Sequence, residues 1–91
     1  MSASWYEIIA KMNLSKECYR VLMMLITLLE FNGILQINQA GLAKDLGMER
    51  QNVHRALKEL IKRKIVTRHM KKNRVTKYEL NGEFFEYDDF E

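Results

Sequence analysis

The sequence contains no proline, a single cysteine, one tryptophan and four glycines among 91 residues. Because proline and low-complexity stretches are lacking, no linker between domains is recognisable, and the length fits one compact domain. The lone cysteine, Cys18, excludes an intramolecular disulfide. Its apolar neighbours predict a buried thiol in a reducing compartment. These absences favour one folded unit that does not depend on cross-links.

Signals for membranes, metals and catalysis are also missing. The longest apolar stretch, residues 21–29, is interrupted by a threonine and is too short to cross a bilayer, and no signal peptide precedes it. His54 and His69 have neither clustered histidines nor a Cys-x-x-Cys motif as partners, so no metal and no cofactor are expected. Asp88 and Asp89 lack a nucleophile or a pocket signature, and no glycine-rich phosphate loop occurs. We therefore predict a cytoplasmic protein that is not an enzyme.

Charge is distributed unevenly along the chain. The net charge is only +3, but residues 50–77 hold eleven basic side chains and one acid, Glu59. The last ten residues reverse this pattern, with five acids and four aromatic side chains in the segment EFFEYDDFE. A strongly basic central stretch is typical of proteins that bind a polyanion.

Hydrophobic periodicity predicts the order helix, helix, strand, helix, helix, strand, strand. The expected helices cover residues 5–12, 15–31, 39–46 and 50–63, and the expected strands cover residues 34–37, 65–70 and 75–80. Ser15 and Asn38 can cap the second and third helices, and Gly47 can end the third in a left-handed conformation. The turn between the last two strands lies at residues 71–74, where Asn73 is the best candidate for a positive φ. The predicted fold class is therefore α+β, mostly α, with a small antiparallel sheet and an extra N-terminal helix.

Residues 39–57, QAGLAKDLGMERQNVHRAL, have the pattern of a helix-turn-helix. Leu42, Leu46, Met48 and Val53 are spaced to face a small core between the two helices, and Gly47 allows a sharp turn. A basic strand–turn–strand follows directly, which predicts a winged helix-turn-helix. We assign residues 1–81 to this domain and residues 82–91 to an acidic aromatic tail.

The basic helix at residues 50–63 is expected to enter the major groove of double-stranded DNA with its N-terminal part nearest the bases. Arg50 or Arg55 could bind guanine, and Gln51, or Asn52 after a slight rotation of the helix, could pair with adenine. His54 is interpreted as a groove contact, and the lysines and the wing residues as phosphate contacts. The predicted DNA-binding residues are Arg50, Gln51, Asn52, His54, Arg55, Lys58, Lys62, Arg68, Lys71, Lys72 and Arg74.

The N-terminal helices carry more apolar side chains than the core of so small a domain requires, which predicts a homodimer. The expected dimerisation residues are Trp5, Ile8, Ile9, Met12, Met24 and Leu28. Two-fold symmetry would place the two groove-binding helices about 34 Å apart on a palindromic site. In the alternative interpretation, the N-terminal segment folds back over its own core.

Residues from about 14 to 85 resemble the winged-helix regulators of the MarR type and also the RepL-type plasmid replication proteins. The second likeness rests on LSKECYRVLMMLI, on GLAKDLGMERQNVHRALKELIKRKIV and on YELNGEFF. This resemblance implies that the second helix of the motif binds the major groove and the wing touches the backbone. It implies control of transcription, or of plasmid or phage replication and copy number. The chain departs from the pattern at Glu49, where Ser or Thr is usual, and at Lys64 and Asn73, where glycine is frequent.

Two other functions stay open at this point. The domain could be a protein-interaction module whose acidic aromatic tail binds a protein partner, or it could bind structured RNA. The tail itself either packs on the domain, as its aromatic content suggests, or covers the basic face and competes with DNA.

Overall fold

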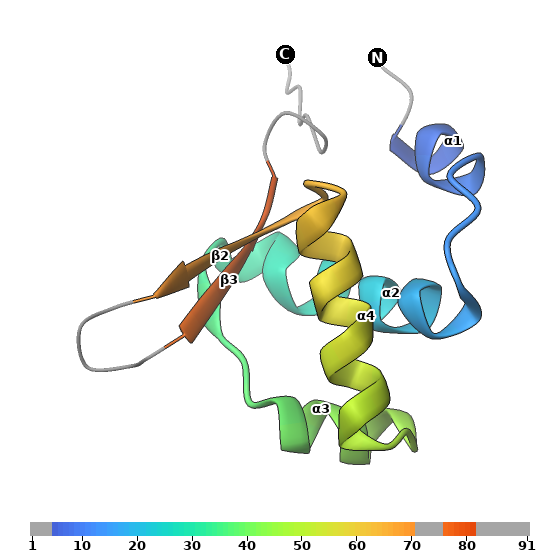
Figure 1. Ribbon diagram of the computed structural model, residues 1–91. Coiled ribbons are helices and arrows are strands. Elements are labelled where there is room, and N and C mark those ends of the chain that lie inside the picture. Colours follow the sequence, from blue (N-terminus) through green and yellow to red (C-terminus); the bar gives the residue numbers. More distant parts are fainter. Residues whose placement is uncertain (1–4, 71–75, 82–91) are drawn as a thin grey trace.

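The computed structural model describes residues 5–70 and 76–81 of the chain, and in these residues a helical body carries a small sheet (Figure 1). Its elements are α1 (Trp5–Ala10), α2 (Lys16–Asn32), β1 (Leu35–Gln36), α3 (Gln39–Leu46), α4 (Arg50–Lys62), β2 (Val66–Met70) and β3 (Thr76–Leu80). The predicted order of elements is confirmed, and β1 and β2 are shorter than expected. The predicted turn at residues 71–74, with Asn73, and the tail at residues 82–91 lie outside the described residues.

The ends of α2 and α3 are fixed by the side chains that the sequence predicts. The Ser15 hydroxyl accepts a hydrogen bond from the backbone N–H of Cys18 at 3.1 Å. The Asn38 side chain accepts from the N–H groups of two residues in the first turn of α3, at 2.9 and 3.2 Å. Gly47 ends α3 in the left-handed conformation, with φ 66° and ψ 35°. These contacts satisfy backbone groups that a helix end would otherwise leave unpaired.

The core forms where α4 lies across α2 and α3 packs against α4 (Figure 1). The apolar residues of α4 recur at helical spacing on one face, where Val53, Ala56, Leu57 and Leu60 are buried and Ile61 is partly buried. The buried side chains of α2 are Cys18, Val21, Leu22, Leu25, Ile26 and Leu29. Burial of this much apolar surface is the main force that fixes α4 on the body.

The described strands form an antiparallel sheet in the order β1-β3-β2. Tyr78 on the central strand β3 lies opposite Leu35 of β1 and Arg68 of β2. Strands β2 and β3 project to one side of the helical body as the wing (Figure 1). Tyr78 itself is only 2% exposed, so the root of the wing belongs to the core.

The segment around α1 packs on its own chain. The Tyr19 hydroxyl donates to the carbonyl of Ile9 at 3.0 Å and accepts from the N–H of Leu14 at 3.2 Å. Ile9 is 6% exposed and Leu14 is 7% exposed. The expectation that Ile9 lies on an exposed dimer surface is therefore corrected, because the single chain already buries this side chain.

The other expected dimerisation residues differ in exposure. Ile8 is 51% exposed. Met12, Met24 and Leu28 are partly buried against the core. The side chain of Trp5 lies outside the described residues. A smaller apolar surface than the sequence predicts is therefore left uncovered.

The connection from α4 to β2 contains a residue in a left-handed conformation, Lys64 with φ 64°. Its carbonyl accepts a hydrogen bond from the Asn81 side chain at 2.6 Å. The frequent glycine of similar proteins falls at this position, and glycine adopts a positive φ without the steric cost that a Cβ atom brings. The Lys64 side chain is exposed to solvent, and the hydrogen bond from Asn81, which follows β3, helps to hold the backbone in this conformation.

Candidate nucleic-acid interface

Helix α4 presents a polar face opposite its buried one. The exposed side chains on the first half of the helix are Arg50, Gln51, His54, Arg55 and Lys58, and Asn52 is half-buried. Lys62, the last residue of the helix, is also exposed. The inner face is apolar and tightly packed, so the helix cannot rotate to hide these groups. The arrangement gives a rigid helix with hydrogen-bonding and basic side chains on its outer side.

The turn before α4 sets how that helix begins. The backbone N–H of Met48 donates to the carbonyl of Ala43 at 2.9 Å, and the side chain of Arg20 on α2 donates to the carbonyl of Leu46 at 2.5 Å. Both bonds hold the end of α3. Glu49 occupies the N-cap position of α4, but its side chain makes no capping hydrogen bond. A carboxylate therefore stands beside the helix start, where it interacts favourably with the helix dipole.

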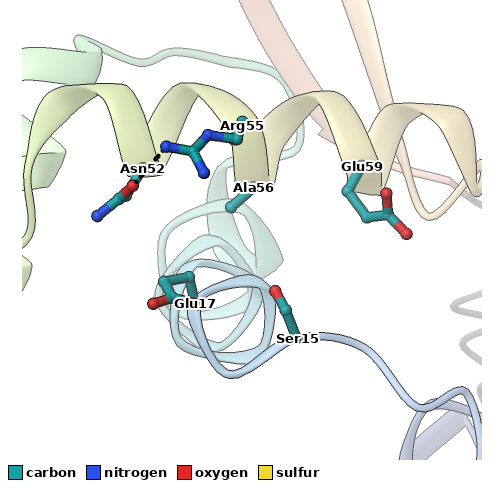
Figure 2. Close-up of a pocket in the computed structure, with 6 residues that line it drawn as sticks. All are labelled: Ser15, Glu17, Asn52, Arg55, Ala56 and Glu59. Atoms are coloured by element: carbon teal, nitrogen blue, oxygen red, sulfur yellow. Dashed lines mark hydrogen bonds between the residues drawn. The ribbon is translucent and has the colours of Figure 1, made fainter.

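Arg55 and Asn52 form a pair on the side of α4 that faces the start of α2. The Arg55 guanidinium donates to the Asn52 side-chain oxygen at 3.0 Å. Figure 2 shows the two side chains turned toward each other above Ser15 and Glu17. A pocket of about 420 Å³ lies here, lined by Ser15, Glu17, Asn52, Arg55, Ala56 and Glu59. The two predicted base-reading residues are thus coupled, because the acceptor of Asn52 is engaged by Arg55.

His54 is held from the opposite side of α4. Its Nδ1 lies 3.3 Å from the Gln39 side-chain oxygen, and the Gln39 side-chain nitrogen donates to the Tyr78 hydroxyl at 3.2 Å. The sequence does not indicate Gln39 as a site residue, since it marks this position only as the start of a helix. The partners of Gln39 are 15 and 39 positions away in the chain. The only sequence signal is a long polar side chain in a helix turn of small and apolar residues.

The wing contributes charge beside α4. Residues directly opposite each other in an antiparallel pair point to the same face of the sheet. Arg68 is exposed and shares a face with its partner Tyr78, whose hydroxyl reaches α3 through Gln39. His69 and Glu79 lie on the other face, with 2.9 Å between the ring nitrogen and the carboxylate. Arg68 is therefore a basic wing residue on the side of α3. The predicted wing contacts Lys71, Lys72 and Arg74 lie outside the described residues.

The core contains a thiol, that of Cys18. Burial raises the pKa of this thiol, and the nearby Glu59 carboxylate raises that pKa further. The thiol is fully buried and lies 3.6 Å from the carbonyl of Ala56 on α4. A buried, protonated thiol is a poor nucleophile and a poor metal ligand. The predicted buried thiol is confirmed.

Across residues 5–70 and 76–81, His, Cys, Asp and Glu side chains do not gather in any group of three that could hold a metal ion. Over the same residues, the helices fall short of the length and apolar character needed to span a membrane. Among the described residues, the predicted DNA-binding side chains that are exposed lie on α4 and, with Arg68, on the wing.

Comparison with known proteins agrees with this geometry. The family model described as MarR family matches residues 12–73, which run from the segment before α2 through the helix-turn-helix and into the wing. Searches of curated proteins and of solved structures returned no match. The family is one of winged-helix proteins that bind DNA and regulate transcription. Since the matched region covers more than half of the chain and contains the whole helix-turn-helix, this chain belongs to the MarR family.

Proposed function

We propose that the protein is a sequence-specific regulator of transcription that binds double-stranded DNA with α4 in the major groove. The observation that carries the proposal is the outer face of α4, which is polar and basic and is set on a fully apolar inner face. An α-helix fits the major groove, where each base pair presents a distinct pattern of donors and acceptors. Membership of the MarR family supports the same function.

The side chains of the face suit different tasks. Arg50 and Gln51 stand at the start of α4, where a groove-binding helix approaches base edges most closely. The Arg55 guanidinium is restrained by its hydrogen bond to Asn52. Such a group can bind the two acceptors of guanine in bidentate fashion. Together these residues supply donors and acceptors for base recognition.

Phosphate contacts are assigned to the basic residues around that centre. Lys58 and Lys62 follow the base-reading residues along the exposed side of α4, and Arg68 extends the charge onto the wing. We assign the same role to Lys71, Lys72 and Arg74. Contacts of this kind position a protein on DNA without reading its sequence, and they make affinity depend on salt.

The protein is proposed to act as a homodimer. Of the predicted surface, Ile8 is exposed, and Met12, Met24 and Leu28 are partly buried. Trp5 completes the proposed set. Two copies related by a two-fold axis would present two α4 helices to successive major grooves of one DNA face.

Selection of bound duplexes from a random library, followed by titration at two salt concentrations, tests the proposed function. We expect a single enriched motif and a steep fall in affinity as salt increases. Lys58→Ala should weaken binding and reduce the salt slope by about one. Lys11→Ala is the matched control, because Lys11 is an exposed lysine that follows α1 and pairs with Glu7, so it belongs to neither α4 nor the wing.

Absence of enrichment and of salt-dependent binding by the wild type would contradict the proposal. It would favour instead a protein-interaction module that uses the acidic aromatic tail. Preferential binding to structured RNA in a competition between duplex DNA and RNA would contradict it as well.

A further inference from the structure

Gln39 links three elements that are distant in the sequence. It is the first residue of α3 and is half-buried between α4 and the sheet. Its side-chain oxygen lies 3.3 Å from Nδ1 of His54 on α4, and its side-chain nitrogen lies 3.2 Å from the hydroxyl of Tyr78 on β3. Both polar ends of one amide are therefore engaged by different elements.

The Tyr78 end of this chain of hydrogen bonds is rigid. Tyr78 is 2% exposed and stands on the central strand, between Leu35 and Arg68. Its ring cannot change rotamer without disturbing the core, so the hydroxyl has a fixed position. Buried hydroxyl groups need hydrogen-bond partners, and Gln39 provides one. The buried Tyr78 hydroxyl therefore orients the side-chain amide of Gln39.

The His54 end is exposed and belongs to the face of α4. An exposed side chain on a helix ordinarily samples several rotamers, and ordering it on DNA reduces affinity. Here Gln39 engages Nδ1 and restrains the ring before any ligand binds. The two nitrogens of imidazole are distinct, and the partner of one determines what the other presents. Nε2 is the nitrogen left for a base edge.

We propose that Gln39 is a positioning residue for base recognition, which holds the His54 ring so that Nε2 reads one base pair of the DNA site. This inference rests on the proposed function. Gln39 does not itself touch a base. It acts by orienting the His54 ring, and the Tyr78 hydroxyl in turn holds the Gln39 side chain in place.

A purely structural role predicts a different result. If Gln39 only ties α3 to the sheet, its loss lowers stability and weakens binding to all sequences alike. If it positions His54, its loss changes the preference at one base pair and leaves the salt dependence unchanged, because no phosphate contact is removed. Base preference therefore separates the two roles.

The experiment uses the full chain and a duplex selected from a random library, with a panel in which each base pair is changed in turn. Gln39→Met keeps the length of the side chain and removes both hydrogen bonds. We expect it to weaken binding to the selected duplex by about threefold to tenfold, the effect of one net hydrogen bond, and to flatten the preference at one position. His54→Ala should flatten the preference at the same position. Combining the two should cause no further loss, since residues that act as a unit are not additive.

Two further variants keep the test falsifiable. Gln39→Glu retains the acceptor for the His54 ring and offers the Tyr78 hydroxyl an acceptor in place of the amide donor. It should therefore keep the base preference even if its charge weakens binding to every duplex. Tyr78→Phe removes the anchor and should reproduce part of the Gln39→Met effect. Melting temperatures of all variants are measured to identify any that unfold.

Additive effects of Gln39→Met and His54→Ala, or unchanged base preference in Gln39→Met, would overturn the inference. In either case wild-type binding to the selected duplex would stand, so the proposed function would survive. If the wild type selects no duplex, the proposed function fails, and this inference fails with it.

Discussion

Neighbouring side chains on α4 differ in how far they are ordered before DNA binds. His54 is restrained by Gln39, and Arg55 by Asn52. Lys58 is an exposed lysine, a flexible chain that ends in a compact charge. A restrained side chain loses less freedom on binding and suits a contact that demands a fixed geometry. A flexible charge suits phosphate, which accepts it over a range of positions.

The first prediction concerns Gln51, which is proposed to contact a base at the start of α4. Gln51→Ala should weaken binding to the selected site by about 1–3 kcal/mol and relax the preference at one base pair. The reason is that a glutamine can pair with both hydrogen-bonding groups of adenine in the major groove. Fluorescence anisotropy with the selected duplex and its single-pair variants measures both effects. Uniform weakening on all duplexes would show that the start of α4 does not enter the groove.

Cys18 gives a second prediction, which concerns alkaline pH. Below about pH 9, the thiol is protonated in both the folded and the unfolded chain, so Cys18 adds no pH dependence. Above that pH the unfolded thiol ionises, while burial keeps the folded one protonated because its pKa is raised. Ionisation then favours the unfolded chain, and the free energy of unfolding should fall by at most about 1.4 kcal/mol per pH unit.

Urea unfolding between about pH 7.5 and 10.5 measures this slope. Cys18→Ala removes the titrating group and should show a shallower slope, although its overall stability is lower because of the cavity it leaves. Equal slopes in the two proteins would contradict the assignment. In the folded wild type, the thiol should also resist alkylation at neutral pH until denaturant is added.

At the scale of elements, the sequence predicts what depends on local chemistry. Ser15, Asn38 and Gly47 mark helix ends because capping and left-handed φ are properties of short segments. The inner face of α4 is predictable because the apolar residues repeat with the helical period. These local features are enough to predict α4 and most of its exposed face from the sequence alone.

What the sequence could not predict depends on contacts between distant segments. Ile9 belongs to an apolar stripe that suits either a dimer surface or the core, and only the packing of Tyr19 on α1 decides between them. Gln39 joins α4 to β3, and neither partner is near it in the chain. The polarity of a residue reveals that it needs partners, but not which ones.

The start of α4 gives a third prediction. Glu49 makes no side-chain cap, so Glu49→Ser should add a hydrogen bond to the first turn and raise the free energy of unfolding by about 0.5 kcal/mol, after loss of the favourable carboxylate–dipole interaction. It should also strengthen DNA binding about threefold, because a negative charge near the phosphates is removed.

Glu49→Ala separates the two effects. Alanine removes the charge without adding a cap, so it should share the gain in DNA affinity and lose stability instead of gaining it. Thermal unfolding and anisotropy titrations on the three proteins measure the two quantities independently. A Glu49→Ser protein that is no more stable than Glu49→Ala would contradict the capping argument.

At the scale of the whole molecule, the charged and apolar surfaces occupy different parts of the fold. In Figure 1, α3 lies beside the start of α4, the wing projects to one side of the helical body, and α1 lies on the other side. A second copy bound through the N-terminal helices would therefore leave both DNA-binding faces open. Because the two surfaces are separate, a dimer can associate through its apolar surface and bind DNA through its charged surface at the same time.

The fourth prediction is that the wild type sediments as a dimer at micromolar concentration and binds a two-fold symmetric site. Ile8→Asp should raise the dissociation constant of the dimer by about tenfold or more, since it places a charge on an apolar interface. Its affinity for an isolated half-site should not change. Ile34→Asp is the matched control, because Ile34 is exposed to a similar extent but lies beside β1. A monomeric wild type would contradict the prediction.

The strand order β1-β3-β2 has a consequence for how the molecule folds. The central strand β3 is the last of the three in the chain, and it pairs with a strand that lies some forty residues earlier. Closing a loop of this length must precede the pairing of β1 with β3, and non-local pairing of this kind slows folding. The pairing of β2 with β3 is local and does not depend on that loop. During synthesis on a ribosome, the helices can pack as they emerge. The sheet cannot form until the central strand, residues 76–80, has been synthesised. A chain truncated before β3 would lack the Tyr78 anchor and leave Val66 uncovered, which makes it a substrate for proteolysis instead of a weakened regulator.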